Sequence, residues 1–356
     1  MFENLSPSDR VLAIQRLTAL WAFNECGLGG VLHALQSPFT GLVVGSIAMI
    51  CIALICVFAE NKWQAVMTSL VIVLVIKALV SPHSSPTAYI AVTFQAVMGA
   101  VFYKYIPNLP FASIFFVCLG LIESACQRIL TLTILYGNSL WEAVDIWGKW
   151  VAEKWGLILP FSSSYMIIVL YLFIHLIAGV FIGWSVYKII IAVQRLWGQS
   201  QYRLYLNNEH QKNIFLKNEG TKKRFRWKRY ALFVVLMLLI VVAYSINEDV
   251  NDFQKGMISV ARAFAILGIW FIFIGPFMMK LLRKYLQKKH NELSVQVGHT
   301  LDMIPQLAWL LDKAWKETQQ RRGFARIKSF VIHSLLYILQ YKTSDDTHTD
   351  RADTQS

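Results

Sequence analysis

The sequence predicts an all-α polytopic membrane protein, with about eight transmembrane helices and additional amphipathic helices in the cytoplasm. Hydrophobic residues make up 56% of the 356-residue chain and charged residues only 15%, which is more apolar surface than a soluble protein of this length can bury. The apolar residues are grouped in runs of roughly 20 to 30 residues, long enough to cross a bilayer. Their even apolarity excludes barrel strands, and helices satisfy their own backbone hydrogen bonds in lipid.

The predicted spans follow one another with short connections in the first half of the chain. The first span is the least apolar, because it carries Arg16, Asn24, Glu25 and three glycines. No cleavable signal peptide is expected, since no short apolar core precedes a small-residue cleavage site near the amino terminus. The spans are 11–35, 41–59, 63–81, 86–105, 109–137, 164–195, 228–247 and 257–284.

The distribution of positive charge predicts the orientation. Lys and Arg crowd into 195–229 and follow again after Lys280, so both segments should be cytoplasmic. Counting back through the first spans places the amino terminus inside and 36–40 and 81–86 outside. We therefore expect a multi-pass protein of the cell membrane, plasma or inner, with both termini cytoplasmic. The basic clusters also suit anionic membrane lipids, whereas nothing in them resembles the aromatic and basic surface of a nucleic-acid-binding protein.

Composition divides the chain into four parts. Residues 1–195 form a six-helix unit with short loops, and residues 196–227 form a polar, strongly basic linker. Residues 228–341 hold a helical hairpin followed by long amphipathic helices, and residues 342–356 form a tail too polar to fold.

Sequence motifs for metal or nucleotide chemistry are absent. The chain contains no CxxC, HExxH, GxSxG, GxxxxGK[ST] or GxGxxG pattern. We therefore expect no bound cofactor and no metal, and any ATP must be used by partner subunits. The cysteines all lie inside predicted helices and are interpreted as small apolar packing residues rather than a disulfide framework; they are Cys26, Cys51, Cys56, Cys118 and Cys126.

Polar side chains in five predicted helices share one depth, at the middle or in the outer half of the membrane. Each ionisable group there costs about 2.5–3.5 kcal/mol on the insertion scale, so these side chains should face one another or a cavity. Lys77 lies at this depth too. Two explanations remain open: a solute pocket that opens outward, or polar contacts between helices, including a Glu123–Arg128 pair. The predicted solute-binding residues are Asn24, Glu25, His33, Gln95, Glu123, Gln127, Arg128 and His175.

The segment 139–156 interleaves four tryptophans with charged residues and is too short and too charged to span. Such a helix suits the outer membrane interface, where indole rings prefer to lie. It is interpreted either as a lid over the pocket or as an interfacial anchor.

Residues 288–341 show two amphipathic patterns, one through Leu301 and Leu311 and one through Val331 and Leu335. Between the patterns lies the turn Arg321-Arg322-Gly323. Cations near a helix carboxyl end and a glycine after it are also what a simple helix cap requires. The turn therefore has a local explanation as well as a functional one.

The stretch 297–324, with Ile304-Pro305 early in its helix and Arg-Gly at its end, resembles the coupling-helix region of T components in energy-coupling-factor (ECF) transporters. Arg321 stands where that family usually has Ala. The resemblance implies that Pro305, Arg321, Arg322 and Gly323 dock on ABC-type ATPase subunits.

The front half resembles a substrate-binding S component of the same transporters. It shares six helices with short loops, an interrupted first helix, the uncharged loop 36–41 and the helix opening at 85–89. The chain as a whole therefore resembles an S-like module joined to a shortened T-like module.

This resemblance implies a membrane subunit of an ATP-driven importer of a vitamin, cofactor precursor or other small solute. Its expected partners are ATPase subunits, with a full T component as a further candidate. Two alternatives remain. One is a membrane enzyme that acts on lipid or isoprenoid with Glu25, Glu123 and His175 as acid–base groups. The other is a scaffold that recruits cytoplasmic partners through its basic segments.

Overall fold

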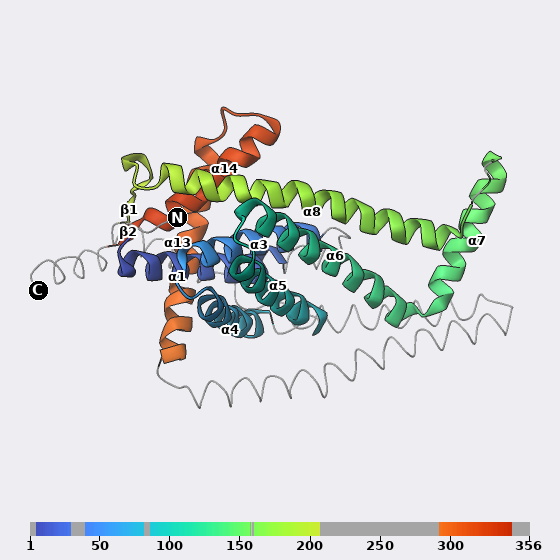
Figure 1. The fold of residues 1–356 in the computed structure, drawn as a ribbon, viewed down its shortest axis with the longest axis horizontal. Helices are drawn as coiled ribbons and strands as arrows, with labels where there is room; N and C mark the ends of the chain where they lie inside the picture. The colour runs from blue at the N-terminus through green and yellow to red at the C-terminus, as the bar shows by residue number, and fades with distance from the viewer. Residues whose placement is uncertain are drawn as a thin grey trace, which may run out of the picture. The chain divides into compact units, whose positions relative to one another are not determined.

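The computed structural model describes residues 5–29, 40–81, 86–156, 158, 160–206 and 292–343. The predicted spans 228–247 and 257–284, most of the basic linker, nearly all of the tail and His33 lie outside these residues. Apart from two strands of two residues each, the regular structure in the described ranges is helical (Figure 1).

The helices match the predicted order. The six-helix unit contains α1 (Pro7–Phe23), the π-helix η1 (Asn24–Leu28), α3 (Thr40–Phe58), α4 (Lys62–Val80), α5 (Pro86–Tyr105), α6 (Leu109–Tyr136), α7 (Asn138–Trp155) and α8 (Ser163–Leu196). The 3₁₀ turn η2 (Ser200–Tyr202) and strand β1 (Tyr205–Leu206) follow, and the carboxyl-terminal part contains α13 (Glu292–Glu317), α14 (Gly323–Gln340) and strand β2 (Lys342–Thr343).

Local side-chain bonds explain several helix starts. The Ser6 hydroxyl accepts a hydrogen bond from the Asp9 amide, and Pro7 occupies the first turn of α1, where its missing N–H has no cost. The Asn61 side chain caps α4 in the same way, with Oδ1 accepting from the Gln64 amide. The two caps satisfy free backbone N–H groups at the starts of α1 and α4. These starts lie close together, since Arg10 pairs with Glu60.

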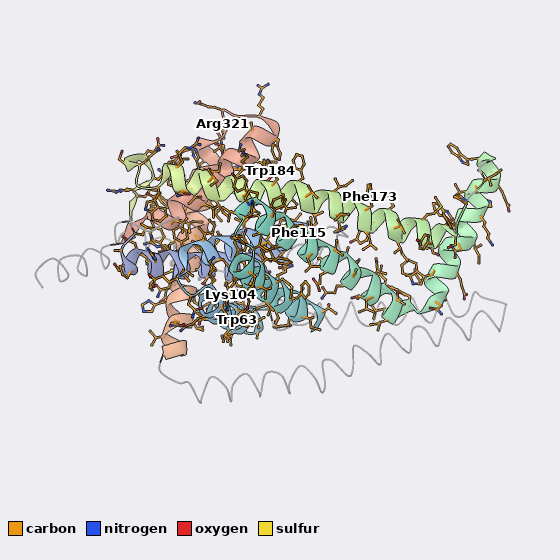
Figure 2. The ribbon with its side chains drawn as sticks, viewed as in Figure 1. Trp63, Lys104, Phe115, Phe173, Trp184 and Arg321 are labelled. Atoms are coloured by element: carbon orange, nitrogen blue, oxygen red, sulfur yellow. The ribbon has the colours of Figure 1, made fainter. Side chains whose placement is uncertain are left out.

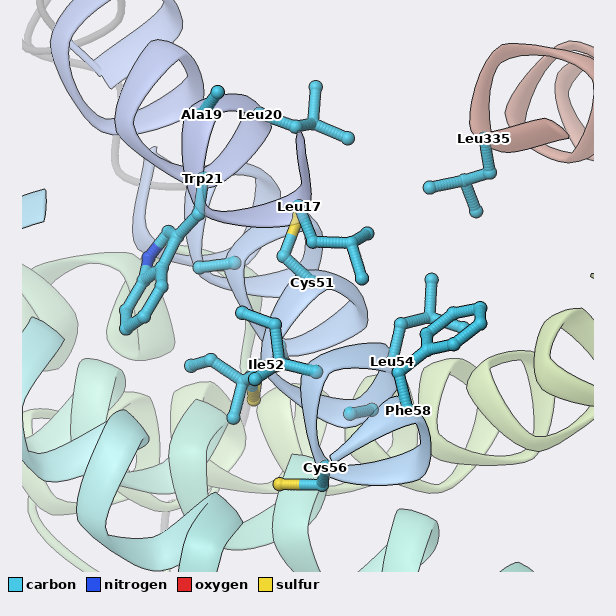
Figure 3. Close-up of a cluster of buried hydrophobic side chains, with 14 of the residues drawn as sticks. Leu17, Ala19, Leu20, Trp21, Cys51, Ile52, Leu54, Cys56, Phe58 and Leu335 are labelled. Carbon is cyan, nitrogen blue, oxygen red and sulfur yellow. The ribbon is translucent and has the colours of Figure 1, made fainter. Parts of the chain in front are cut away.

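The chain divides into two compact units, and the larger contains 1–129, 167–212 and 279–356. Its core joins side chains from the amino-terminal helices to side chains of the carboxyl-terminal hairpin formed by α13 and α14 (Figure 3). Leu17 of α1, Leu54 of α3 and Leu335 of α14 belong to this one buried cluster. Strand β1 pairs in parallel with β2, so the ends of the two parts also join through backbone hydrogen bonds.

Four of the described helices are long and apolar enough to cross a membrane: α3, α4, α6 and α8. They match four of the predicted spans. Helix α5, which carries Gln95 in its middle, and α1, which has only 17 residues, are not among the four. The first predicted span, 11–35, is corrected in part: α1 already begins at Pro7, and the helix changes to π geometry at Asn24.

Helices α6 and α8 approach closely at two glycines of α8. A side-chain carbon added at Gly179 would lie 2.7 Å from the Cα of Cys118, and one at Gly183 would lie 2.6 Å from the Cα of Ile114. Any larger residue would force the helices apart. The four-residue spacing of these glycines predicts a close helix approach, and the structure shows that α6 is the helix that approaches them.

The second unit contains residues 130–166 among those described, and its main element is the tryptophan-rich helix α7. Asp145 of α7 holds the first turn of α8: its Oδ1 accepts from the Ser164 amide at 2.7 Å and its Oδ2 from the Ser164 hydroxyl at 3.0 Å. Gly156 ends α7 with a φ of 63°, the left-handed conformation that glycine adopts readily. The predicted helix over 139–156 is therefore confirmed as a helix.

Candidate functional site

The most unusual feature of the larger unit is a buried ion pair between Glu25 and Lys77. The Lys77 Nζ lies 2.5 Å from the Glu25 Oε2, and the two side chains are only 3% and 4% exposed. Removing two charges from water costs several kcal/mol per ion, and their mutual attraction only offsets that cost when the geometry is good. A pair this deep is thus weak evidence for a stabilising role.

Glu25 is presented by the π-helix η1. In a π turn the backbone N–H bonds five residues back, and here the Gly29 N–H donates to the Asn24 carbonyl. A π turn accommodates one extra residue within a helix and changes the direction of the following side chains, and such turns are frequent at functional sites. The buried face of α1 packs into the apolar core. The π-helix that follows α1 changes the direction of the next side chains, which explains how the Glu25 carboxylate points toward α4.

A small cavity of about 80 Å³ lies beside the ion pair. Its walls come from η1, α3, α4, α5 and α6, so every one of these elements contributes to one site. The volume is enough for a few water molecules or for one polar group of a ligand. The lining residues are Glu25, Thr40, Gly41, Val44, Gly45, Lys77, Thr87, Ala88, Ala91, Val92, Gln95, Ser124 and Gln127.

Buried oxygen atoms on three neighbouring side chains have no hydrogen-bond partner within the described ranges: Asn24 Oδ1, Gln95 Oε1 and Glu123 Oε2. The Asn24 amide nitrogen does have one, since it donates to the Val44 carbonyl at 2.9 Å. Leaving a buried acceptor unsatisfied costs about 1–3 kcal/mol. A ligand with N–H or O–H donors would satisfy such oxygens, so the site suits a donor-rich solute.

The structure brings together five of the predicted solute-binding residues. Glu25, Gln95 and Gln127 line the cavity. Asn24 and Glu123 are adjacent to lining residues, and Glu123 Oε1 accepts from the Gln127 Nε2 at 3.4 Å. The sequence pattern of polar residues at one depth therefore predicts the site on η1, α5 and α6.

The other predicted residues lie elsewhere. Arg128 is exposed, and no Glu123–Arg128 ion pair forms among the residues that the structure describes, so that alternative is not supported. His175 is buried on α8 with its Nδ1 2.9 Å from the Tyr171 carbonyl, and it does not line the cavity. The contact with the Tyr171 carbonyl, one helical turn away, therefore gives the buried imidazole a polar partner without any ligand.

Sequence reasoning placed Lys77 at the same predicted depth as the binding residues but did not include it among them. The signal was present, because Lys77 is the one charged residue in the otherwise uncharged stretch 63–81. The two glycines of the lining were also missed. A side-chain carbon at Gly41 would lie 2.0 Å from the Ser124 hydroxyl, and one at Gly45 would lie 3.2 Å from the Gln95 Nε2. Both glycines make room for polar groups from the facing helices.

The predicted coupling residues lie on the α13–α14 hairpin. Helix α13 continues through Pro305, and Arg321 and Arg322 lie in an exposed turn (Figure 2). Gly323 has a φ of 58°, as a left-handed glycine should, but it begins α14 instead of ending α13, which stops at Glu317. The expected C-terminal cap of α13 is thus wrong in its position, because three further residues form a separate turn first.

Apolar side chains flank this basic turn. Phe324 is 63% exposed and Ile327 is 56% exposed, while the Arg326 guanidinium stacks over the Trp315 ring at 4.0 Å. Exposed aromatic and arginine side chains around a defined turn are typical of protein interfaces. The surface formed by Trp315, Arg321, Arg322, Phe324 and Ile327 is named the hairpin tip.

Helix α1 connects the hairpin to the cavity. Arg16 is 2% exposed; its Nη1 donates to the Leu339 carbonyl at 3.0 Å, and its guanidinium lies over the Tyr341 ring at 3.9 Å. Glu25 follows on the same helical path, roughly 13 Å further along the axis. A movement of α14 would therefore act on the helix that carries the buried carboxylate.

The described residues hold no group of three or more His, Cys, Asp or Glu side chains placed to bind a metal ion. What the site offers is a pair of opposite charges, unsatisfied acceptor oxygens and a small volume between five helical elements. Comparisons with protein-family models, curated proteins and solved structures found no match for the chain.

Proposed function

We propose that this chain is the membrane subunit of an ECF-type importer, which binds a small solute from outside and couples to separate ABC-type ATPase subunits. The observation that carries the proposal is the buried Glu25–Lys77 pair beside a polar cavity. The solute is a vitamin, a cofactor precursor or another small molecule rich in hydrogen-bond donors. A full T component is a possible further partner.

In this proposal the chain crosses the cell membrane about eight times, with both termini in the cytoplasm. The four apolar helices α3, α4, α6 and α8 are the strongest support. The basic segments of the sequence orient the protein. The Glu25–Lys77 cavity then lies toward the outer surface, and the hairpin tip lies on the cytoplasmic side.

The cavity recognises the solute through charge and hydrogen bonding. A solute group that donates to Gln95, which lines the cavity, replaces the missing partner of its buried oxygen. The ion pair provides both signs of charge at one place, so Glu25 receives an N–H or O–H group while Lys77 receives a carbonyl or carboxylate. The volume of 80 Å³ takes only the polar part of a vitamin-sized molecule.

The hairpin tip provides the coupling. Arg321 and Arg322 present planar, permanently charged groups to acidic or carbonyl acceptors on an ATPase. Nucleotide-dependent closure of the ATPases would move α13 and α14, and the Arg16 contact to Leu339 transmits that movement to α1. In the larger unit, α1 therefore links the hairpin to the Glu25–Lys77 cavity.

The enzyme alternative has weaker support. Glu25 is held by Lys77, and His175 does not line the cavity that Glu25 lines. An acid–base mechanism needs groups within hydrogen-bond reach of one substrate atom, and these groups do not meet that condition among the described residues.

Two variants test the proposal in a crossed design. Arg321→Ala with Arg322→Ala alters the hairpin tip, and Glu25→Gln with Lys77→Met alters the cavity. The second variant removes both charges together, because removing one alone leaves an uncompensated buried charge. Each protein is purified from membranes of its native host, and copurifying subunits and small molecules are identified by mass spectrometry.

We expect subunits with nucleotide-binding motifs to copurify with the wild-type chain and the cavity variant, but not with the tip variant. A small molecule should copurify with the wild-type chain and the tip variant, but not with the cavity variant. ATPases that remain bound to the tip variant would contradict the coupling role. A solute that remains bound to the cavity variant would contradict the site.

A further inference from the structure

A second cavity, of about 370 Å³, lies at the opposite ends of the helices that form the Glu25–Lys77 cavity. It is bounded by the start of α1, the α3–α4 turn and α13, all within the larger unit. From Asn61 at its rim to Lys77 is roughly 24 Å along α4. That distance approaches the thickness of a bilayer core, so in the proposed orientation this cavity lies at the cytoplasmic side of the membrane.

The lining of the cavity combines apolar and polar side chains. Ile14 of α1, Phe58 of α3, Ile72 of α4 and Met303 of α13 contribute the apolar part. The volume corresponds to about a dozen groups the size of a water molecule, and a methylene group is of similar size. The cavity is therefore large enough for part of one acyl chain, which the apolar part of the lining would contact.

Among the described residues, the rim has one cationic and one anionic side chain. Arg10 and Glu60 form an ion pair, with Arg10 Nη1 2.9 Å from Glu60 Oε1, and their side chains are 19% and 78% exposed. Because the Glu60 carboxylate is exposed, this pair resembles a surface pair, which contributes only about 0–1 kcal/mol, and a ligand can compete with it at little cost. A ligand with a single negative charge would meet the Glu60 carboxylate as well as Arg10, whereas a ligand with both charges fits both.

We propose that this cavity binds one zwitterionic phospholipid, with its acyl chain among the apolar residues, its phosphate on Arg10 and its ammonium on Glu60. Phosphatidylethanolamine is the chemical class that fits best, because its primary ammonium can donate hydrogen bonds to the carboxylate. This inference rests on the proposed placement of the chain in a membrane. It adds a site that neither solute binding nor ATPase coupling requires.

The bound lipid would hold α13 against α1 and α4. Gln296, His299 and Thr300 of α13 face the cavity together with Gln64 of α4 and Gln15 of α1. The same helices carry the hairpin tip at one end and the Glu25–Lys77 pair at the other. The lipid is thus placed to stabilise the connection that the coupling mechanism uses.

The test is native mass spectrometry of the purified full-length protein after incubation with an equimolar mixture of phosphatidylethanolamine, phosphatidylcholine and phosphatidylglycerol. We expect one phosphatidylethanolamine per chain to be retained at least tenfold over phosphatidylglycerol. Glu60→Gln should abolish this preference, whereas Glu142→Gln, a matched change on α7 outside the cavity, should leave it unchanged. Because Glu60 is exposed, its change should not impair folding.

Ala65→Phe fills the cavity and should lower lipid retention at least tenfold; an unchanged melting temperature shows that the variant is folded. Soluble glycerophosphoethanolamine at the same concentration should not displace the lipid, since it lacks the acyl chain. Equal retention of all three lipids, or full retention in Ala65→Phe, would overturn the inference. If the wild-type chain retains no lipid but still binds solute and ATPase subunits, the lipid site is contradicted and the importer is not. If it retains the lipid but binds neither solute nor ATPase subunits, the importer is contradicted and the lipid site is not.

Discussion

Helices α3 and α8 are both strongly apolar, yet they have different surroundings. In the most apolar 18-residue stretch of each, 61% of the α3 residues are buried and only 17% of the α8 residues. Helix α3 is covered by α1, α4 and α5, and Ile52 and Leu54 are fully buried in the core (Figure 3). Helix α8 instead exposes large side chains, including Phe173 and Trp184 (Figure 2).

The difference shows that hydropathy alone does not distinguish a protein-facing helix from a lipid-facing one. Phe173 is 54% exposed and Phe181 is 65% exposed. A water-soluble surface rarely leaves such a contiguous apolar stripe uncovered. Lipid would cover it in the proposed membrane placement. Helix α3, in contrast, belongs to the packed part that positions the Glu25–Lys77 site.

The largest effect is expected in the packed part, at the ion pair. Lys77→Met alone should destabilise the protein by about 3–5 kcal/mol, because Glu25 remains as an unpaired buried charge. The double change with Glu25→Gln should recover most of that loss. Thermal unfolding in detergent measures both. Equal losses in the single and double variants would show that the charges do not interact in the folded protein.

A matched pair of isoleucines tests the comparison directly. Ile52→Ala in α3 should cost about 2–5 kcal/mol, since a buried cavity is created. Ile174→Ala in α8 should cost much less, because that side chain is already 42% exposed. Chemical denaturation of both variants in the same detergent gives the two values. Similar costs would mean that α8 is covered by protein in the native assembly.

A charge placed on α8 distinguishes lipid from water as its neighbour. Phe173→Arg should reduce membrane insertion by about 2.5–3.5 kcal/mol if the position faces the bilayer centre. Val295→Arg on α13, where the side chain is similarly exposed at 55%, should insert normally. The membrane-integrated fraction of each variant is the measurement. Normal insertion of Phe173→Arg would place α8 outside the lipid.

The smallest effect is expected from His333, on α14. Burial lowers the pKa of His333 below its usual value of 6.5, and of the nearby charges Glu317 raises it and Arg321 lowers it. The ring also contacts Tyr202 and Tyr337. Because the unfolded chain binds the proton more readily, stability contributed by neutral His333 is full above pH 6.5 and falls as the pH decreases below that value.

His333→Gln should remove this acid-dependent part of the stability. The measurement is the melting temperature of the wild-type chain and of the variant between pH 5 and 8. This range extends about one to two units on either side of the usual histidine pKa. A wild-type curve with the same slope as the variant would show that another group is responsible.

Much of the fold could be predicted from the sequence because helices depend on interactions between residues close together in the chain. Apolar runs and caps such as Asn61 determine helices wherever they occur, and a polar residue in an apolar run marks a site or a contact. The sequence therefore predicts the first, fourth and fifth spans as elements of the site, through Glu25, Gln95 and Gln127. It also predicts a close helix approach at Gly179 and Gly183, but not that α6 is the partner.

The remaining features depend on three-dimensional packing that no single segment encodes. The choice of Lys77 over Arg128 as a buried partner depends on which helix lies beside η1. The docking of α14 on Arg16 joins residues more than 300 positions apart. The second cavity arises only where α1, α4 and α13 meet. The π turn at Asn24 likewise has no sequence signal beyond the glycines that follow it.

The central claim, solute import, is tested most directly by depletion of compounds from the growth medium. Cells of the native host carrying the wild-type chain, the cavity variant or the tip variant are compared by untargeted mass spectrometry of the medium, with Lys104→Gln, an exposed change near the end of α5, as the control. We predict at least one compound that wild-type and control cells remove and that both other variants leave in place. If the cavity variant and the tip variant deplete every compound as the wild-type cells do, the importer account is wrong.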